Sequence, residues 1–203
     1  TRHPKQGMYR ARSAGETTAA ELDWTISESA FAFSEGDIEA DWRNLEDVAI
    51  VMPKRWFESH VNIRAVDRDS RVVHLDRPVI EGVIDEQGNP ARYWVENVFE
   101  HMDEPGQFYH DRLNHRLYYL PRFADRPETA MVIAPRLEYL LRVEGEPFGK
   151  KVHDVRFESL DFRHAEYAYP PGYAGPVQAA FTLPGAITLR GAEDCTFYAC
   201  TVS

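Results

Sequence analysis

Three carboxylates near the C-terminal end of the chain, Asp161, Glu166 and Asp194, have side chains that could carry out a reaction. Two carboxyl groups that face each other across a sugar-sized gap can hydrolyse a glycosidic bond. Asp194 follows Gly191-Ala192-Glu193 at the start of an expected strand, where aspartate commonly satisfies the backbone of a turn, so we assign it a structural role. Asp161 and Glu166 are the catalytic candidates, with simple solvation of an outward-facing carboxylate as the alternative for both.

Three tyrosines that follow Glu166 are candidates for binding a sugar. Tyr167, Tyr169 and Tyr173 lie in a segment, 165–176, that is too rich in proline and glycine to be a strand. Tyrosine offers a flat apolar ring for stacking and a hydroxyl for a hydrogen bond at the edge of the sugar. The alternative is that these rings fasten the loop to the neighbouring part of the protein. We retain the three as candidate substrate-binding residues.

The sequence shows no spacing that is typical of a metal site or of a cofactor. The eight histidines are scattered, and His153 and His164 sit near carboxylates at strand ends, where hydrogen-bonded or solvated histidine is the usual role. Cys195 and Cys200 occupy positions that align with buried apolar residues. No serine–histidine–aspartate set, phosphate loop or dinucleotide motif is present. We therefore predict neither a metal nor a cofactor.

A phrase that occurs twice predicts the fold around these candidates. Residues 154–162 begin with a polar residue, continue with a short apolar–polar–apolar strand and a two-residue break, and end in a second short strand. Residues 194–202 repeat this pattern. Two short strands with a bend cannot close a core alone, so the repeat indicates a parallel β-solenoid whose coils stack. We predict parallel, in-register stacking of these pairs: Val155 with Cys195, Phe157 with Phe197, Leu160 with Cys200, and Phe162 with Val202.

The region before the repeat, from about Ala14 to Pro135, has the pattern of an antiparallel β-unit. Two hairpins are predicted, 60–66 with 71–75 and 107–111 with 116–121. In the turn of the second hairpin, Asn114 is the residue that tolerates a left-handed backbone. Glu104-Pro105-Gly106-Gln107 fits a type II turn, and residues 41–47 are expected to form one helical turn.

Charge and length restrict the possible partners. The formal net charge of the 203 residues is −10, which argues against nucleic acid or an anionic membrane surface as a partner. No apolar stretch has the length of a membrane span, and the first residues have no apolar core of the kind found in signal peptides. The first residue, Thr1, and the strand that runs to Ser203 lead us to expect a segment of a longer polypeptide.

Several stretches of the sequence resemble one known family. Residues 95–111 followed by Leu117-Tyr118-Tyr119-Leu120-Pro121, together with segment 42–48, are similar to sequences of bacterial right-handed parallel β-helix proteins. Leu160 to Ala165, leading into a Pro-Pro-Gly-Tyr loop, and Arg2-x-Pro4 carry the same likeness. These proteins are carbohydrate-active, and the resemblance is to glycoside hydrolase family 141 and its relatives. Asn114-His115 stands where relatives commonly carry glycine.

The resemblance implies an all-β fold, with the start of a right-handed, pectin lyase-like parallel β-helix and an inserted antiparallel β-sandwich or barrel-like domain. We expect the antiparallel domain in residues 1–136 and the first coils in 137–203, with a loop at 165–180. The implied partner is a polysaccharide or oligosaccharide, and the implied location is secreted, periplasmic or at the cell surface.

The expected function is therefore that of a segment of a glycoside hydrolase acting on plant or microbial polysaccharide. The family places the catalytic carboxylates after Ser203, so we expect this chain alone to be inactive. The alternative is a non-catalytic carbohydrate-binding protein or a polysaccharide lyase. A lyase needs a basic residue and positive charge or calcium against a uronate, and the acidic composition favours the hydrolase.

Overall fold

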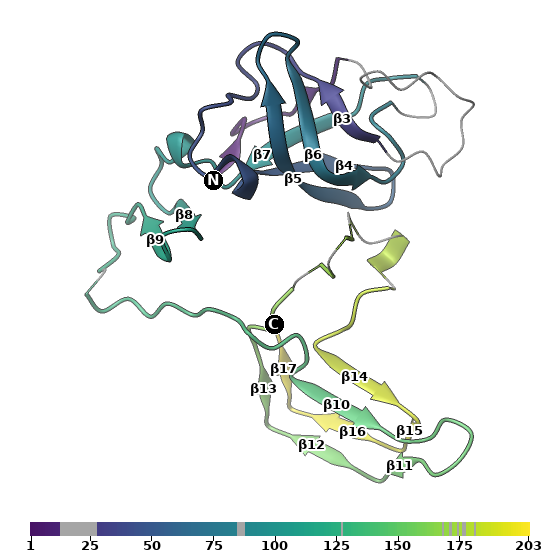
Figure 1. The fold of residues 1–203 in the computed structure, drawn as a ribbon. Helices are drawn as coiled ribbons and strands as arrows, with labels where there is room; N and C mark the ends of the chain where they lie inside the picture. The colour runs from purple at the N-terminus through teal and green to yellow at the C-terminus, as the bar shows by residue number, and fades with distance from the viewer. Residues whose placement is uncertain are drawn as a thin grey trace. The chain divides into compact units, whose positions relative to one another are not determined.

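The structure is a computed structural model that describes residues 1–12, 28–84, 88–126, 128–167, 169–170, 172–173, 175, 178–180 and 182–203. The expected start of the antiparallel region at Ala14 lies outside these residues. The chain divides into two units, which are described separately: a first unit of residues 1–130 and 171–180, and a second unit of residues 131–170 and 181–203 (Figure 1). Among the described residues, no helix is long and apolar enough to cross a membrane.

The first unit is built on one antiparallel sheet. Its strands follow the order β1-β7-β4-β5-β6-β3, and β2 also pairs with β7. The strands are β1 (Arg2–His3), β2 (Tyr9–Arg10), β3 (Glu28–Ala32), β4 (Ala49–Pro53), β5 (Glu58–Asp67), β6 (Val72–Val79) and β7 (Arg92–Glu96). The antiparallel pairing confirms the prediction for this region. The expected sandwich or barrel-like domain is present as one antiparallel sheet, and its described strands form no closed barrel. The amide of Arg12, just after β2, donates to the carbonyl of Ala32 in β3 over 2.7 Å.

Alternation along the strands produces the core of the first unit. In β5, every second residue from Ser59 to Ile63 is buried, as expected for a strand with one face against the core. Phe31 of β3 meets Tyr93 of β7 edge to face, with ring centroids 5.0 Å apart, and both side chains are fully buried. The largest buried apolar side chains around them are Ile50, Met52, Ile63, Leu75, Val48, Val61, Val73 and Val79.

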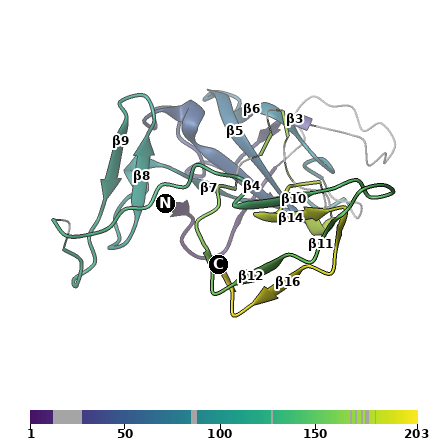
Figure 2. The ribbon, with the colours of Figure 1, turned by 90° about the horizontal axis from the view of Figure 1, so that it is seen from below.

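Both predicted hairpins are confirmed. Strand β5 pairs with β6, and β8 (Phe108–Asp111) pairs with β9 (Arg116–Tyr119), so that Phe108 lies opposite Tyr119. Figure 2 shows the β8–β9 hairpin at one side of the sheet. The left-handed residue in its turn is His115, with φ of 52°, and not Asn114 as predicted. The side-chain amide of Asn114 instead donates to the carboxylate of Asp111, and this contact links the two ends of the turn.

Two short 3-10 helices complete the connections around this hairpin. The predicted helical turn in 41–47 is present as η1 (Leu45–Asp47), and η2 (Phe99–His101) precedes the hairpin. The predicted type II turn is confirmed, because Gly106 has φ of 92° and the amide of Gln107 donates to the carbonyl of Glu104 over 3.2 Å. A third 3-10 helix, η3 (Gln178–Ala180), also belongs to the first unit.

The second unit consists of paired parallel strands, as the repeated phrase predicted. Phe157 is in register with Phe197, and Phe162 with Val202. The amide of Thr196 donates to Val155 and that of Thr201 to Leu160, which continues the ladder past the two other predicted pairs. The pairs are β10 (Leu141–Glu144) with β14 (Ile187–Arg190), β11 (Val152–His153) with β15 (Ala192–Glu193), β12 (Arg156–Glu158) with β16 (Thr196–Tyr198), and β13 (Asp161–Phe162) with β17 (Thr201–Val202).

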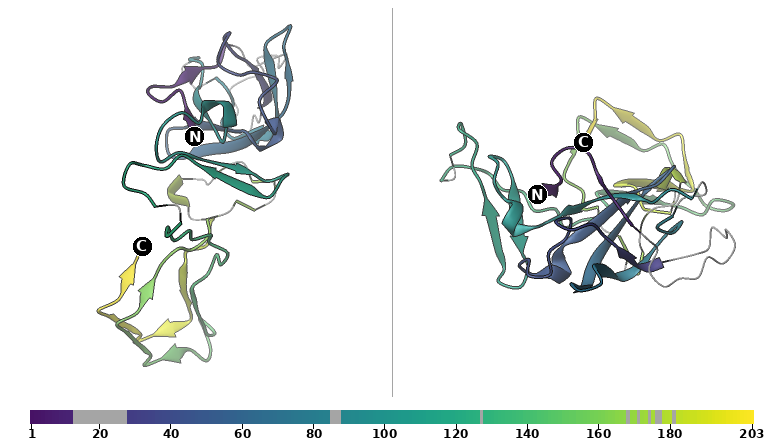
Figure 3. Two further views of the ribbon diagram at one scale, coloured as in Figure 1. Left: turned by 90° about the vertical axis from the view of Figure 1, so that its left-hand side faces the viewer. Right: turned by 90° about the horizontal axis from the view of Figure 1, so that it is seen from above.

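The corners between these strands repeat as well. Asp154 and Asp194 have φ of 59° and 50°, and Ser159 and Ala199 have φ of 55° and 51°. The breaks seen in the sequence are thus equivalent left-handed bends in two successive turns of chain (Figure 3). At another corner Gly191 fits against Gly145, where an added Cβ would come within 2.5 Å of the opposite backbone.

The region that leads into the first parallel strand differs from the expectation. The first coils were expected from residue 137, whereas β10 begins at Leu141 and residues 131–139 are in no strand. The cysteines are free and half-buried, and the Cys200 thiol lies 3.5 Å from the carbonyl oxygen of Phe157. This position agrees with the prediction that Cys200 packs in the ladder.

Candidate functional site

The candidate carboxylates lie on the second unit, where the chain leaves β13. Asp161 points outward, with 58% of its side chain exposed, and its carboxylate contacts the Arg163 guanidinium at 3.0 Å. Glu166 is exposed, and its amide donates to the carbonyl of Leu137 over 2.9 Å. A general acid for glycoside hydrolysis needs an environment that keeps its proton at neutral pH. Asp161 is instead exposed and held in an ion pair with Arg163.

A hollow adjoins Glu166 on the second unit. Its lining includes the polar residues Arg136, Arg163 and His164. The hydrogen bond between Glu166 and Leu137 places the glutamate backbone at the wall of this hollow, because Leu137 is one of its lining residues. The apolar lining is formed by Ile133, Ala134, Pro135, Leu137 and Leu140. Such a surface can receive a ligand that has an apolar ring face and a negatively charged or hydrogen-bonding group.

Two of the three candidate tyrosines lie together. Tyr167 and Tyr169 meet edge to face with ring centroids 5.5 Å apart, and Tyr167 is 66% exposed. Tyr173 belongs to the first unit, where its carbonyl oxygen accepts a hydrogen bond from the Arg77 guanidinium over 3.1 Å. The sequence alone did not reveal that the three tyrosines belong to different units. The boundary between the units falls after residue 170, between Tyr169 and Tyr173.

The outward wall of the parallel strands is covered by ion pairs. Arg156 contacts Glu158 at 2.9 Å and lies over the Tyr198 ring, 4.5 Å from its centroid. Lys151 contacts Glu193 at 2.9 Å, and this hydrogen bond lowers the pKa of the Glu193 carboxyl. These carboxylates therefore bind neighbouring cations, which suits a solvated structural wall better than acid–base chemistry.

A buried carboxyl that sequence reasoning missed lies in the first unit. Asp37 is only 7% exposed and accepts a hydrogen bond from the Tyr93 hydroxyl over 3.0 Å. Burial raises the pKa of Asp37, and burial together with the nearby carboxyl raises the pKa of Tyr93 as well. The pair connects the turn at 34–37 to β7 inside the core, so we assign it to stability. Nothing in the sequence around Asp37 distinguished it from an ordinary turn residue.

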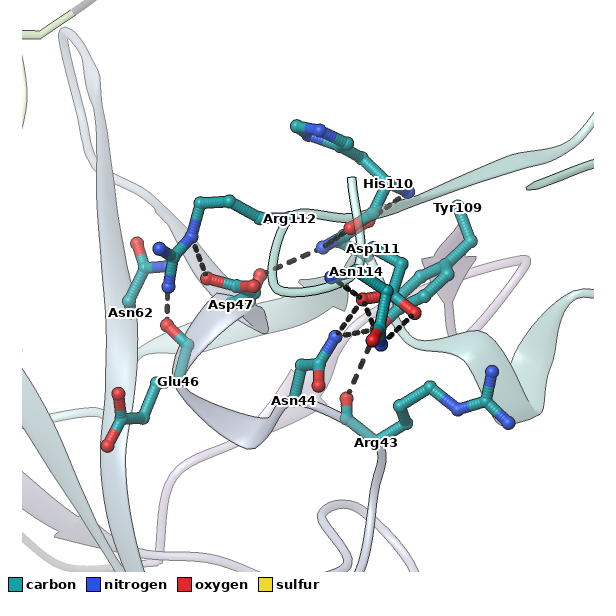
Figure 4. Close-up of polar contacts among 11 residues, drawn as sticks. Arg43, Asn44, Glu46, Asp47, Asn62, Tyr109, His110, Asp111, Arg112 and Asn114 are labelled. Carbon is teal, nitrogen blue, oxygen red and sulfur yellow. Dashed lines mark hydrogen bonds and ion pairs between the residues drawn. The ribbon is translucent and has the colours of Figure 1, made fainter. Parts of the chain in front are cut away.

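A hydrogen-bonded network fastens the β8–β9 hairpin to η1 (Figure 4). The Asn44 amide donates to the Tyr109 hydroxyl and to the Asp111 carboxylate, both over 2.9 Å. The side chain of Arg112 contacts Asp47 at 2.8 Å. Asn44 itself has a left-handed backbone with φ of 49°, a conformation that asparagine adopts more readily than most residues. The network holds the hairpin from its inner face.

Aromatic packing reinforces the same face. The Phe99 ring meets Tyr109 and Tyr118 edge to face at 5.2 and 5.3 Å, and the Arg43 guanidinium lies 3.7 Å from the Phe99 centroid. Tyr109 is fully buried. The outer face of the hairpin, by contrast, is open, and this surface was not singled out from the sequence.

Metal binding is not suggested by the described side chains, which contain no group of three histidine, cysteine, aspartate or glutamate residues placed to hold an ion. The molecule is thus an all-β chain with an antiparallel unit and a parallel-strand unit.

Comparison with known proteins gives this arrangement a family context. Residues 42–122 match the family model of the GH141 insertion domain, a region that runs from just before η1 through the β8–β9 hairpin. A solved structure described as "Glycoside hydrolase" is similar over 84% of this chain and 29% of its own, with 22% sequence identity and a TM-score of 0.62. No curated protein matches the sequence.

The match to the GH141 insertion domain agrees with the resemblance seen in the sequence. The insertion-domain match covers the hydrogen-bonded network, and the structural likeness shows a shared fold. The chain spans less than a third of the length of the solved structure that it matches.

Proposed function

We propose that this chain is part of a glycoside hydrolase that acts on plant or microbial polysaccharide. The observation that carries the proposal is the match of residues 42–122 to the GH141 insertion domain. That segment contains Asn44, Asp47, Tyr109 and Asp111, whose contacts fix the hairpin to η1. The fold likeness to a solved glycoside hydrolase supports the same proposal.

In this proposal, the second unit forms two coils of a right-handed parallel β-helix. The four parallel strand pairs and the repeated left-handed corners support the proposal, because a solenoid builds each coil from equivalent strands and bends. The first unit then corresponds to the antiparallel domain that interrupts such a helix, with the boundary near residue 136.

The catalytic carboxyl pair is proposed to come from outside this chain. Asp161 is paired with Arg163, and Glu158 and Glu193 on the same wall are also paired with cations. Glu166 is exposed at the surface, without the buried environment that a general acid needs. The corner with Glu166, Tyr167 and Tyr169 would bind part of the polysaccharide beside the catalytic centre. We further propose a bacterial protein that is secreted, periplasmic or on the cell surface, where its polymeric substrate would be accessible.

One observation favours the alternative of a polysaccharide lyase. Arg136, Arg163 and His164 line the hollow, and basic groups of this kind can neutralise a uronate and remove a proton. The hydrolase remains the preferred proposal because the described part of this chain matches a hydrolase insertion domain.

The test is to express the complete reading frame that encodes this chain and to assay it on xylan, pectin and fucosylated glycans, with the 203-residue chain beside it. We expect release of reducing sugars by the complete protein and none by the 203-residue chain. Turnover by the purified chain that disappears in Asp161→Asn or Glu166→Gln would overturn the placement of the catalytic pair. Absence of turnover by the complete protein on every glycan would count against the hydrolase.

A further inference from the structure

The outer face of the β8–β9 hairpin is an open aromatic surface on the first unit. Phe108 lies opposite Tyr119, and Leu117 is two positions from Tyr119, so the alternation of a strand puts all three side chains on one face. Their exposed fractions are 55%, 41% and 53% for Phe108, Tyr119 and Leu117. The opposite face carries the buried Tyr109 and Asp111. Apolar side chains thus lie exposed on the outer face of the hairpin, opposite to the face that the Asn44 network binds.

This surface is held in place before any ligand arrives. The inner face is fixed to η1 by the network of Asn44, and the Tyr119 hydroxyl donates to the Asp125 carboxylate, which also accepts from the Arg122 amide. The ring of Tyr119 is therefore fixed from both its backbone and its hydroxyl. Preorganised rings lose little freedom on binding, which favours a role in recognition.

The charge beside the rings is opposite to that of the whole chain. Residues 108–126 contain four arginines and two aspartates, whereas the chain carries a formal net charge of −10. Asp111 is buried in the network, and Arg116 lies opposite it on the inner face of the hairpin. Asp125 accepts the hydrogen bond of the Tyr119 hydroxyl, whereas Arg122 and Arg126, on the segment after β9, are exposed and form no ion pair within the described residues. The Arg122 side chain lies against Gly106, at the end of the hairpin where Phe108 and Tyr119 face each other.

We propose that this face, with Phe108, Tyr119 and Arg122, binds an acidic oligosaccharide. A pyranose ring has an apolar face that fits an aromatic ring, and a uronate carboxylate is matched in geometry by a guanidinium. The local positive charge in an acidic chain selects an anionic over a neutral glycan. The site goes beyond the proposed hydrolase activity, because it would bind the polymer on the insertion domain without cleaving it.

The experiment measures binding of the 203-residue chain to an oligogalacturonate by calorimetry. The matched probe is the fully methyl-esterified oligomer, which keeps the same rings but lacks the negative charge, and a neutral xylo-oligosaccharide is the second control. We expect binding to the acidic oligomer that weakens about tenfold or more after esterification and also weakens as salt is added.

Variants assign the binding to this face. Tyr119→Ala and Phe108→Ala should each weaken binding about tenfold, since each removes one stacking ring. Arg122→Gln should weaken binding of the acidic oligomer and leave that of the esterified oligomer unchanged. Phe148→Ala is the matched control, because this ring is fully exposed on the second unit and should not matter. Tyr119→Phe keeps the stacking ring and should bind the acidic oligomer as the wild type does. If Tyr119→Ala fails to fold, Phe108→Ala still tests the loss of a stacking ring.

Three results would overturn the proposal. They are equal binding of acidic and esterified oligomers, unchanged binding in the ring and Arg122 variants, and the absence of binding to any glycan. If light scattering instead shows a dimer that Tyr119→Ala dissociates, the face is an interface between two copies of the chain. Each of these results leaves the hydrolase proposal standing, because turnover is measured separately.

Discussion

Asn44 provides the sharpest test of how the hairpin is held. Replacement by alanine removes the hydrogen bonds to Tyr109 and Asp111, each worth about 1 kcal/mol net. Alanine must also adopt the left-handed backbone at φ of 49°, which costs about 1 kcal/mol more for a residue with a Cβ. The expected loss of unfolding free energy for Asn44→Ala is therefore about 3 kcal/mol.

Asn44→Gly separates the two contributions. Glycine accepts the left-handed backbone, so only the hydrogen bonds are lost and the expected destabilisation is about 2 kcal/mol. The assay is denaturant unfolding of both variants, with hydrogen exchange of the peptide 108–119 to detect local opening of the hairpin. If Asn44→Ala changes the unfolding free energy by less than about 0.5 kcal/mol and leaves exchange unchanged, the network does not hold the hairpin.

Three further predictions follow from other parts of the molecule. Burial raises the pKa of Asp37 above its ordinary value of 3.8, so the native state keeps this proton to a higher pH than the unfolded state does. The wild type should therefore lose stability relative to Asp37→Asn as the pH rises from 3.8 through the raised pKa. Unfolding free energies measured below pH 3.8 and at neutral pH check this, and an unchanged difference between the proteins contradicts it. Phe157→Ala removes a half-buried ring stacked on Phe197 at 4.8 Å and should destabilise the second unit by about 2 kcal/mol in denaturant unfolding, while the exposed Phe148→Ala should have no effect. In the complete protein, Asp161→Asn should leave turnover nearly unchanged, whereas a loss on the order of a hundredfold would make Asp161 a catalytic residue.

The parallel pairing could be predicted because aligning the two copies of the repeated phrase also aligns their apolar positions, and this alignment gives the register of the strands. The alternation places Phe157 and Phe197 on the same face of the paired strands, where their rings stack, and a shift by one residue would turn these rings to the other face. The two hairpins were predictable for the same reason. Their turns were less so, since His115 rather than Asn114 adopts the left-handed conformation. A turn of several polar residues offers more than one position for that conformation.

The site was harder to predict than the fold because it depends on contacts between distant segments. The sequence does not reveal that Asp37 meets Tyr93, or that the carboxylate of Asp161 meets Arg163. The open face with Phe108 and Tyr119 was also missed, because the consecutive apolar residues of these strands place rings on both faces and do not indicate which face is buried. Only the packing of the inner face against Phe99 shows which rings remain exposed.

The most direct test of the central claim, that this chain belongs to a glycosidase, is to follow the chemistry of cleavage by the complete protein in heavy-oxygen water. Hydrolysis breaks the bond between the anomeric carbon and the glycosidic oxygen, so it should place one heavy oxygen on each new reducing end and give saturated products in mass spectrometry. A lyase would instead give products with a new carbon–carbon double bond and near-ultraviolet absorbance, without the isotope. Labelled, saturated products are the predicted result, and unlabelled, unsaturated products would contradict the account.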